Sequence, residues 1–328
     1  MGLVGAALFA AVSCTPPEDS TSSGTGGQGT STSTSSSSTN TTSGTTTTLP
    51  SDPNCAVPPD ADATVTEGVP AAGLTCIRYP FPLASPRDVL IANDGAIFVT
   101  EYGAGRIREL SADGFVPVAE GLVSPIGLRE DDGGSLLVTE ENLFSLARID
   151  RKTGARTQIA KLSNHVTYMT RGPDGAAYIS SFAGLSDNNL AAVYRVDLSN
   201  GTITPFATGM DVPEGVFFDP NGAFRAAEWF SPARILAFPP SGGDAANAAV
   251  LAEDLEHVYG LISDGKGGVL IADSTGQILR ITQEGARTTL LTGIGVPGGM
   301  ALSANGDLYI AEFRGFGQTG YLIRLQGL

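Results

Sequence analysis

One sequence pattern recurs six times between Ser85 and the end of the chain, at intervals of roughly 40 residues. Each copy holds a short apolar run, a tight turn, and a second apolar run that ends in a polar residue. The turns contain Gly, mostly beside Asn or Asp, which supply the positive φ that tight hairpins need. These turns are Asn93-Asp94-Gly95, Asp132-Gly133-Gly134, Pro173-Asp174-Gly175, Pro220-Asn221-Gly222, Lys266-Gly267-Gly268 and Asn305-Gly306-Asp307. Six copies of one hairpin unit constrain the fold more than any other feature of the chain.

Two kinds of polar residue recur with the repeat. Six residues beyond the turn glycines stand Glu101, Glu140, Ser181, Glu228, Asp273 and Glu312. Such regular recurrence is typical of side chains that cap turns, so we expect these acids to be architectural. Arginines recur on the following run, at Arg108, Arg148, Arg195, Arg280 and Arg324. We expect them to pair with acids on neighbouring strands or blades.

The repeats predict an all-β fold. Four antiparallel strands about every 40 residues, without helical periodicity, are typical of β-propeller blades. We therefore expect a six-bladed β-propeller of four-stranded antiparallel blades, spanning residues 54–328. The sixth copy stops after three strands. Residues 74–79 are expected to supply the missing outer strand and so to close the ring.

The chain ahead of the propeller divides into two unlike segments. Residues 3–13 form an uncharged apolar run that ends in Ala11-Val12-Ser13-Cys14, which resembles a bacterial lipobox. The resemblance implies a signal segment at 1–14 and lipidation of Cys14. The pattern departs from an export signal in one respect, since no Lys or Arg precedes Arg78. Residues 15–53 are dominated by Ser, Thr and Gly, a composition that predicts a disordered tether.

Cysteine content and charge narrow the compartment and the partners. With Cys14 assigned to lipid, Cys55 and Cys76 are left to form a disulfide that closes a loop of about 20 residues. Disulfides favour an oxidising compartment, so we expect an exported, membrane-anchored lipoprotein that meets the membrane through its anchor only. The 34 acids outnumber the 19 bases, for a net charge of −15, which argues against nucleic acid as a partner. We expect a monomer.

Three motifs carry a resemblance to the NHL-repeat and SMP-30/gluconolactonase-like propellers. They are residues 98–107 (Phe-Val-Thr-Glu-Tyr-Gly-Ala-Gly-Arg-Ile), Val212-Pro213-Glu214-Gly215 and Leu270-Ile271-Ala272-Asp273. The resemblance covers residues 74–328 and implies the propeller fold. Lactonases, lyases, quinone-dependent sugar dehydrogenases and binding proteins share such motifs, so the motifs leave the activity open.

Residues that break the repeat predict the site. In a propeller the innermost strands start, and the second strands end, at one mouth of the central channel, where a ligand can bind. We expect the inner strands to start at Arg87-Asp88, Ile126-Gly127, Val166-Thr167, Glu214-Gly215, Tyr259-Gly260 and Gly298-Gly299. Arg87, Asp88, Glu214 and Tyr259 differ there from their counterparts in the other blades. His165 and His257 stand beside two of these starts and can titrate near neutral pH.

Aromatic residues follow the ends of the second strands and predict an apolar rim at the same mouth. They are Tyr102, Phe182, Trp229 and Phe313. We expect some of these rings to pack between blades, and Trp229, the only tryptophan, to contact the ligand. It lies in the same blade as Glu214, which makes that blade the best single site.

Three functions fit these residues, and catalytic residues are assigned for none of them. The first is binding of a small molecule, sugar or peptide at the mouth. The second, implied by the resemblance, is a divalent-metal-dependent hydrolase of lactones or esters, with calcium or zinc held by Glu214, Asp88 and Asn164. The third is a quinone-dependent sugar dehydrogenase, whose catalytic histidine and basic cofactor ligands cannot be placed in this sequence.

Overall fold

The computed structural model describes residues 55–58, 61, 65–183, 191–314 and 318–328. Cys14, the signal segment at 1–14 and the linker at 15–53 lie outside the described residues and stay predictions. The described residues all belong to one compact unit. Within the described ranges, no helix has the length and apolar character needed to cross a bilayer.

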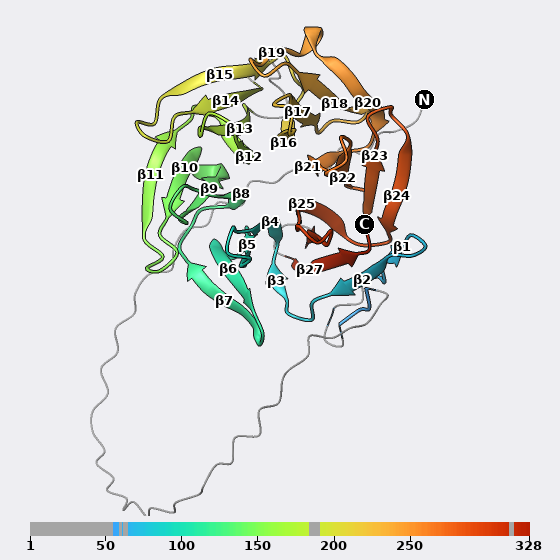
Figure 1. Cartoon of the computed structure of the whole chain (residues 1–328). Coiled ribbons are helices and arrows are strands. Elements are labelled where there is room, and N and C mark those ends of the chain that lie inside the picture. Colours follow the sequence, from blue (N-terminus) through green and yellow to red (C-terminus); the bar gives the residue numbers. More distant parts are fainter. Residues whose placement is uncertain (1–54, 59–60, 62–64, 184–190, 315–317) are drawn as a thin grey trace, which may run out of the picture. The chain divides into compact units, whose positions relative to one another are not determined.

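Six antiparallel sheets stand around a central axis and form the predicted six-bladed β-propeller (Figure 1). The strands are given from the innermost outward. Blade 1 consists of β4 (Pro86–Ile91), β5 (Ile97–Glu101), β6 (Arg106–Ser111) and β7 (Gly114–Ala119), and blade 2 of β8 (Pro125–Glu130), β9 (Leu136–Glu140), β10 (Ser145–Ile149) and β11 (Arg156–Lys161). Blade 3 consists of β12 (His165–Arg171), β13 (Ala177–Phe182), β14 (Ala192–Val196) and β15 (Ile203–Thr208). The short β19 (Gly243–Asp244) extends blade 3 in parallel to β15.

Blades 4 to 6 repeat this order. Blade 4 consists of β16 (Pro213–Phe218), β17 (Phe224–Glu228), β18 (Ala233–Phe238) and β20 (Ala249–Leu255), and blade 5 of β21 (Val258–Ser263), β22 (Val269–Asp273), β23 (Gln277–Ile281) and β24 (Arg287–Thr292). Blade 6 consists of β25 (Val296–Leu302), β26 (Leu308–Phe313) and β27 (Thr319–Gln326), with β2 (Thr75–Arg78) as its outermost strand. In the described ranges, two single turns of 3-10 helix lie between strands, η1 (Glu141–Leu143) and η3 (Ala245–Asn247).

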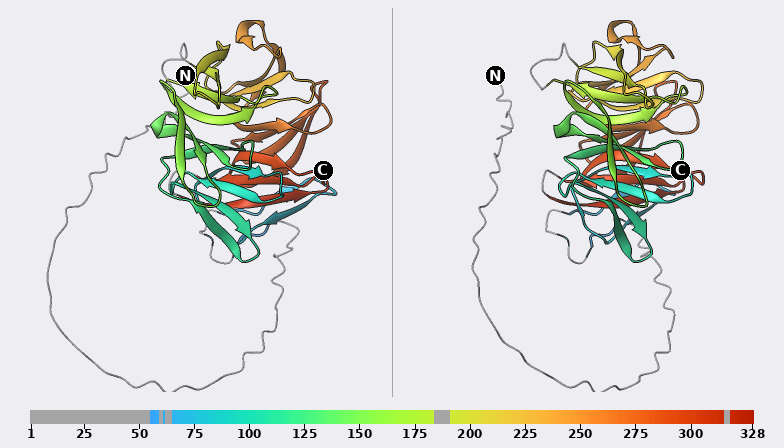
Figure 2. Two further views of the ribbon diagram at one scale, coloured as in Figure 1. Left: turned by 60° about the vertical axis from the view of Figure 1, so that its left-hand side comes forward. Right: turned by 90° about the vertical axis from the view of Figure 1, so that its left-hand side faces the viewer.

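The two ends of the propeller close the ring by strand pairing. β2 pairs antiparallel with β27 and supplies the fourth strand of blade 6, which confirms the closing strand expected at 74–79. Figure 1 shows blue β2 beside red β27, and Figure 2 shows the same blade from the side. The sequence did not predict the short strands β1 (Val69–Pro70) and β3 (Leu83–Ala84), which pair with β24 and β27.

A covalent bond and a buried ion pair hold this closure together. Cys55 and Cys76 form the predicted disulfide, with their Cα atoms 4.8 Å apart. The Arg78 guanidinium donates to both carboxylate oxygens of Glu312 at 2.9 Å and to the Cys55 carbonyl at 2.8 Å. Both side chains of the ion pair are fully buried. The residues before blade 1 are therefore joined to the last blade.

The core lies between neighbouring blades. Each blade is covered on both faces, and this explains why its strands read as apolar runs. Phe98 and Leu136, both fully buried, belong to one cluster that spans blades 1 and 2. Phe224 of blade 4 packs in the same way with Val193 of blade 3. Burial of each such side chain contributes about 1.5–3 kcal/mol, so the packing holds the inner strands in fixed positions around the axis.

The repeated acids have the architectural contacts expected of them. In four blades the carboxylate accepts a hydrogen bond from the backbone N–H of the residue 17 positions earlier, and so fastens the chain that leads into the inner strand. These pairs are Glu101 with Ala84, Glu140 with Val123, Glu228 with Asp211 and Glu312 with Gly295. The same four carboxylates pair with Arg106, Arg156, Arg234 and Arg78.

The repeated arginines also pair with acids, at the opposite end of the blades. Their partners are aspartates that follow the inner strands: Arg148 with Asp131, Arg195 with Asp174, Arg280 with Asp264 and Arg324 with Asp307. Arg108 differs, because it donates to the Phe115 carbonyl and lies 3.8 Å from Glu101.

Candidate functional site

Every inner strand has a β-bulge next to its start, and the six bulges define the candidate site. The register with the second strand shifts between Pro86 and Val89 in blade 1, and at the matching place in the other five blades. A bulge frees residues from the ladder and re-aims their side chains. The first freed residues are Arg87, Ile126, Thr167, Glu214, Tyr259 and Gly298, and the second are Asp88, Gly127, Tyr168, Gly215, Gly260 and Gly299.

These twelve positions match the inner-strand starts expected from the sequence in five blades. In blade 3 the freed pair is Thr167-Tyr168, one residue later than the expected Val166-Thr167, because the bulge falls between Val166 and Met169. We call the first positions, together with the aromatic side chains at or directly after the ends of the second strands, the mouth. Four of the six first positions are polar: Arg87, Thr167, Glu214 and Tyr259.

The second positions pack the inner strands against one another. Glycine predominates there because the next blade leaves no room for a side chain. A Cβ on Gly215 would lie 2.5 Å from the Leu261 nitrogen, and a Cβ on Gly260 would lie 2.3 Å from the Gly298 oxygen. Only Asp88 and Tyr168 carry side chains at these positions, and both use them to join blades.

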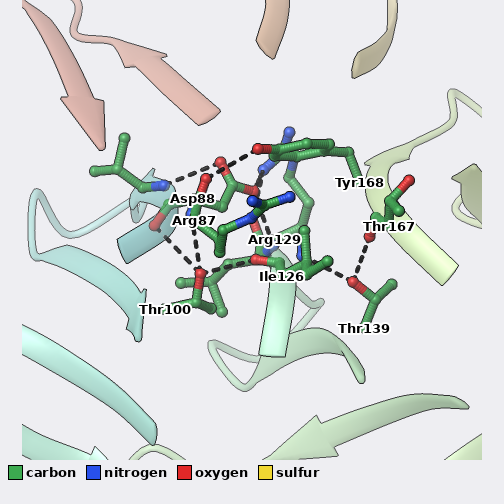
Figure 3. Close-up of polar contacts among 11 residues, drawn as sticks. Arg87, Asp88, Thr100, Ile126, Arg129, Thr139, Thr167 and Tyr168 are labelled. Atoms are coloured by element: carbon green, nitrogen blue, oxygen red, sulfur yellow. Dashed lines mark hydrogen bonds and ion pairs between the residues drawn. The ribbon is translucent and has the colours of Figure 1, made fainter. Parts of the chain in front are cut away.

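Asp88, predicted to bind ligand and metal at the mouth, has another use in the structure. Its Oδ2 accepts from the Leu128 N–H at 2.9 Å and from Arg129 at 2.8 Å, and its Oδ1 accepts from its neighbour Val89 at 2.9 Å. The side chain is fully buried, and burial raises its pKa against the opposing effect of Arg129. Asp88 therefore joins blade 1 to blade 2, as Figure 3 shows.

Tyr168 closes the channel below the mouth. Its hydroxyl donates to the Arg87 carbonyl at 3.1 Å, so the side chain crosses the axis from blade 3 to blade 1 (Figure 3). Burial raises the pKa of this phenol. The cavity left beside Tyr168 and Asp88 measures about 10 Å³, which is room for one water molecule at most. The mouth thus ends in a closed floor.

Hydroxyl groups fix the backbone of three first positions. The Thr100 hydroxyl donates to the Ile126 carbonyl at 2.8 Å, and the Ser180 hydroxyl donates to the Glu214 carbonyl at 2.6 Å. Thr139 donates to the Thr167 carbonyl in the same way (Figure 3). In each case the second strand of one blade holds the inner strand of the next, so the mouth residues are carried by a rigid frame.

Arg87 is a buried cation beneath an aromatic rim. Only 5 % of the residue is exposed. Its guanidinium carbon lies 4.6 Å from the ring centre of Phe313, 5.2 Å from that of Tyr259 and 5.8 Å from that of Tyr102. Such cation–π contacts contribute about 0.5–2 kcal/mol each. Burial alone would lower the pKa of Arg87, and the surrounding tyrosines and Glu214 raise it above its usual value.

Glu214 is the buried carboxyl group of the mouth. It is 5 % exposed, and its Oε2 makes no hydrogen bond within the described ranges. Burial raises its pKa to about 8, although the Arg87 charge and the Thr167 hydroxyl act in the opposite direction. Val212, two residues earlier, has a φ of 45°, a costly conformation for a β-branched residue. The strained backbone at Val212 therefore leads into the inner strand that carries Glu214.

The predicted rim residues form two groups at the mouth. Trp229 contacts His257 at 4.5 Å between ring centres and Tyr259 at 6.2 Å, and Tyr259 in turn faces Arg87. Across the mouth, His165 stacks on Phe182 at 5.3 Å. The structure therefore brings Trp229, His257 and Tyr259 to one side of the Arg87 and Glu214 pair, and His165 to another.

Sequence reasoning missed Glu141, Phe144 and Tyr168. Glu141 lies 3.8 Å from His165 Nδ1 and contributes to the pKa shifts of both Arg87 and Glu214. Phe144 packs edge-on against His165 at 4.9 Å. The signal for Glu141 was a second acid directly after the repeated Glu140, which no other blade has at that place. No such signal existed for Tyr168, because the bulge in β12 could not be placed.

The residues described at the mouth do not fit a divalent cation. Calcium takes about six to eight oxygen ligands, and zinc about four ligands of N, S or O. In the described part of the chain, no three His, Cys, Asp or Glu side chains gather closely enough to hold an ion. In the predicted set of Glu214, Asp88 and Asn164, the buried Asp88 carboxylate is directed to Leu128 and Arg129 of the next blade. Asn164 lies half-buried before β12.

Fold and site together define a six-bladed propeller whose mouth carries one buried arginine and one buried carboxyl group under aromatic rings. The family model of the SMP-30/gluconolactonase/LRE-like region matches residues 88–310. The chain belongs to this family, which confirms the resemblance stated from its motifs. It is a lactonase-like propeller. None of the curated proteins matches it.

Solved structures of similar fold share little sequence with the chain. A gluconolactonase from Xanthomonas campestris superposes with a TM-score of 0.65 at 16% identity, covering 84% of this chain and 98% of its own. The calcium-binding protein regucalcin from Agrobacterium tumefaciens gives 0.63 at 16% identity, covering 74% and 90%. An oxidoreductase described as a glucose dehydrogenase from Thermus thermophilus gives 0.65 at 17% identity, covering 77% and 100%. At these identities the likeness supports the fold alone.

Proposed function

We propose that the mouth binds a small, oxygen-rich molecule of the sugar or sugar-derivative class. Sugars combine hydroxyl groups with apolar C–H faces, and the mouth offers the matching combination of buried polar groups and aromatic rings. Trp229, Tyr259 and His257 supply a continuous aromatic surface. Arg87 and Glu214 lie below it.

The observation that carries this proposal is the Glu214 carboxyl group. A buried polar atom without a hydrogen bond costs about 1–3 kcal/mol, and folded proteins leave few such atoms unsatisfied without a functional reason. Glu214 Oε2 is such an atom within the described ranges. A ligand hydroxyl or carbonyl at the mouth would give the Glu214 carboxyl group its missing hydrogen-bond partner.

Binding is tested by saturation-transfer NMR and calorimetry with D-glucose, D-gluconate and D-glucono-1,5-lactone. We expect at least one of the three to bind the wild-type protein, and Glu214→Gln to weaken that binding. Glu140→Gln is the matched control, because Glu140 is a buried glutamate with a full set of partners outside the mouth. Absence of binding by all three compounds, or equal binding by Glu214→Gln, would refute the proposal.

A second candidate function is the hydrolysis of lactones or esters at the same mouth. Family membership favours it, and so does the pKa of Glu214, raised to about 8 by burial. A carboxyl group that titrates near neutral pH can take or give a proton in the reaction. With D-glucono-1,5-lactone in a pH-stat, we expect acid release above the spontaneous rate, rising through pH 8 and lost in Glu214→Gln. Release equal to that in buffer alone would leave binding as the only function.

We further propose that the protein is exported and anchored through lipid on Cys14. The Ala11-Val12-Ser13-Cys14 motif supports the anchor, and the Cys55–Cys76 disulfide is typical of an oxidising compartment. Mass spectrometry of the membrane fraction should find Cys14 acylated, and Cys14→Ser should release the protein into the soluble fraction. A wild-type protein with unmodified Cys14 would contradict the anchor.

A further inference from the structure

We propose that Arg87 itself supplies the positive charge of the mouth, in place of a divalent cation, and that the site therefore selects a sugar acid through its carboxylate. This inference rests on the proposed function and names the ligand class of the same site.

The position of Arg87 is fixed by three blades. Tyr102 follows the second strand of blade 1, Tyr259 starts blade 5 and Phe313 ends the second strand of blade 6, and the guanidinium lies within 6 Å of all three ring centres. Glu214 of blade 4 acts on the Arg87 charge. Such a cation is held at the centre of the mouth and needs little further ordering when a ligand arrives.

The Arg87 charge acts on Glu214 and would therefore repel a second cation placed beside that carboxyl group. Repulsion between like charges is strong where water is excluded, and both Arg87 and Glu214 are buried. Two side chains with oxygen atoms act on Glu214, the Thr167 hydroxyl and the Glu141 carboxylate. Glu141 lies beside His165, and the Asp88 carboxylate is turned into the joint between blades 1 and 2. Two carboxyl groups and one hydroxyl are fewer oxygen ligands than calcium takes, whereas the buried arginine beside them can bind an anion.

A carboxylate is the anion that these groups fit. The planar guanidinium matches the two oxygens of a carboxylate and forms short, charge-assisted hydrogen bonds with it. Glu214, whose pKa is raised to about 8 by burial, carries a proton at neutral pH and can donate it in a hydrogen bond to the same anion. The hydroxyl-bearing carbons of a sugar acid would then face Trp229 and Tyr259.

The overall acidity of the protein does not oppose this assignment. The net charge of −15 is distributed along the chain, and at physiological salt exposed charges are screened beyond about 8 Å. The field at the closed floor of the mouth is therefore dominated by Arg87 and its neighbours. We expect D-gluconate to be preferred over D-glucose, which has no carboxylate and is closed into a pyranose ring.

The test combines two titrations of the full chain. Metal-free protein is titrated with CaCl2, MnCl2 and ZnCl2 by calorimetry, and separately with D-gluconate and D-glucose in buffer that contains EDTA. Arg87→Met is compared with wild type, and Arg280→Met serves as the control because Arg280 pairs with Asp264 at the other end of its blade. Circular dichroism and melting temperature establish that each variant is folded.

We expect no metal binding at micromolar concentration, and D-gluconate binding that persists in EDTA. Arg87→Met should weaken D-gluconate about tenfold or more, the value of a lost charge-assisted hydrogen bond, and should change D-glucose little. Arg280→Met should bind as wild type does. If Arg87→Met does not fold, Arg87→Lys keeps the charge without the planar fork and should weaken D-gluconate more than D-glucose.

Two results overturn the inference. One is wild-type metal binding that Glu214→Gln abolishes, and the other is loss of D-gluconate binding in EDTA. If neither D-gluconate nor D-glucose binds, the proposed function fails for this class of ligand. The metal titration alone then decides whether Arg87 takes the place of a divalent cation. The failure of one proposal is thus distinguishable from the failure of the other.

Discussion

Glu140 and Glu214 are both buried glutamates near the axis of the propeller, and they differ in how completely they are bonded. Glu140 accepts hydrogen bonds from the Val123 N–H at 3.0 Å, from Ser145 at 3.3 Å and from Arg156 at 2.6 Å. Glu214 keeps one buried oxygen without a partner in the described ranges, and burial raises its pKa to about 8. Glu140 belongs to a set that recurs around the ring, whereas Glu214 occurs once.

In a repeat protein, the recurrence of a buried polar residue separates an architectural role from a functional one. A polar residue that recurs in every blade can be satisfied by the other repeated parts, as the four glutamates at the ends of the second strands are. A polar residue that occurs once has no such partner built into the repeat, and its burial is costly. Among the residues that the bulges free, the Glu214 carboxyl group therefore marks the site.

Breaking the buried ion pair that closes the ring should have the largest effect. Arg78→Met removes the partner of Glu312 and leaves a buried charge uncompensated, which we expect to lower the free energy of unfolding by about 3–5 kcal/mol. Urea denaturation followed by fluorescence measures the loss. Arg148→Met is the control, since the Arg148 side chain is 37% exposed in its pair with Asp131. A loss below that of the control would show that the closure does not depend on Arg78.

Removing the disulfide should have the next largest effect. Cys55 and Cys76 are 21 residues apart, and a cross-link over such a loop contributes about 3 kcal/mol by limiting the unfolded chain. Cys55→Ser together with Cys76→Ser should lower the melting temperature and leave sugar binding at the mouth unchanged. Equal melting temperatures for the double variant and the wild type would mean that β2 pairs with β27 without help from the disulfide.

The pH dependence of stability should reveal Glu214. Burial raises the pKa of this carboxyl group from its ordinary value of 4.5 to about 8 in the folded protein. Between these pH values the unfolded state has released its proton and the folded state still holds it, so each rise in pH favours unfolding. Wild-type stability should therefore fall from about pH 4.5 to about pH 8 relative to Glu214→Gln. Parallel curves for the two proteins would place the Glu214 carboxyl in contact with water.

Glu140→Gln should behave in the opposite way to Glu214→Gln at pH 7. It loses a charge-assisted hydrogen bond to Arg156, and we expect a loss of about 1–3 kcal/mol in the free energy of unfolding, with binding unaffected. Glu214→Gln should be more stable than the wild type at pH 7, since it carries no carboxyl group with a raised pKa, and it should lose binding. Paired denaturation and NMR titration of the two variants measure the contrast directly. The expected contrast is contradicted if both variants lose stability, because Glu214 would then stabilise the fold as Glu140 does.

The fold could be predicted from the sequence because its information is repeated. Six turns such as Asn93-Asp94-Gly95 each specify a hairpin locally, and six consistent local signals fix the number of blades. The closing strand also followed, since blade 6 lacked a strand and residues 74–79 offered an unassigned run ahead of blade 1. The short strands β1 and β3 could not be predicted, because two-residue pairings leave no periodic signal.

The site could be predicted only as a set of positions. Arg87, Glu214 and Tyr259 were predicted at the mouth because they differ from their counterparts in the other repeats. The same criterion selected Asp88, whose side chain turns to the next blade. Neighbouring residues on a strand point to opposite sides, and the bulge decides which side faces the mouth. The position of a bulge depends on packing between blades, as the one-residue shift to Thr167-Tyr168 shows. Sequence alone therefore could not assign Asp88 to the joint or Tyr168 to the axis.

The smallest effect should come from the exposed pairs at the other end of the blades. Arg195 and Asp174 lie 2.7 Å apart with side chains 32% and 38% exposed, and pairs of this kind contribute about 0–1 kcal/mol. Arg195→Met should therefore change the free energy of unfolding by less than about 1 kcal/mol, with a difference from wild type that disappears in high salt because screening already removes the attraction. A larger, salt-independent loss would mean that Arg195 stabilises blade 3 through its aliphatic chain. Recurrence would then indicate a packing role for the arginine, and the pairing with acids would be secondary to it.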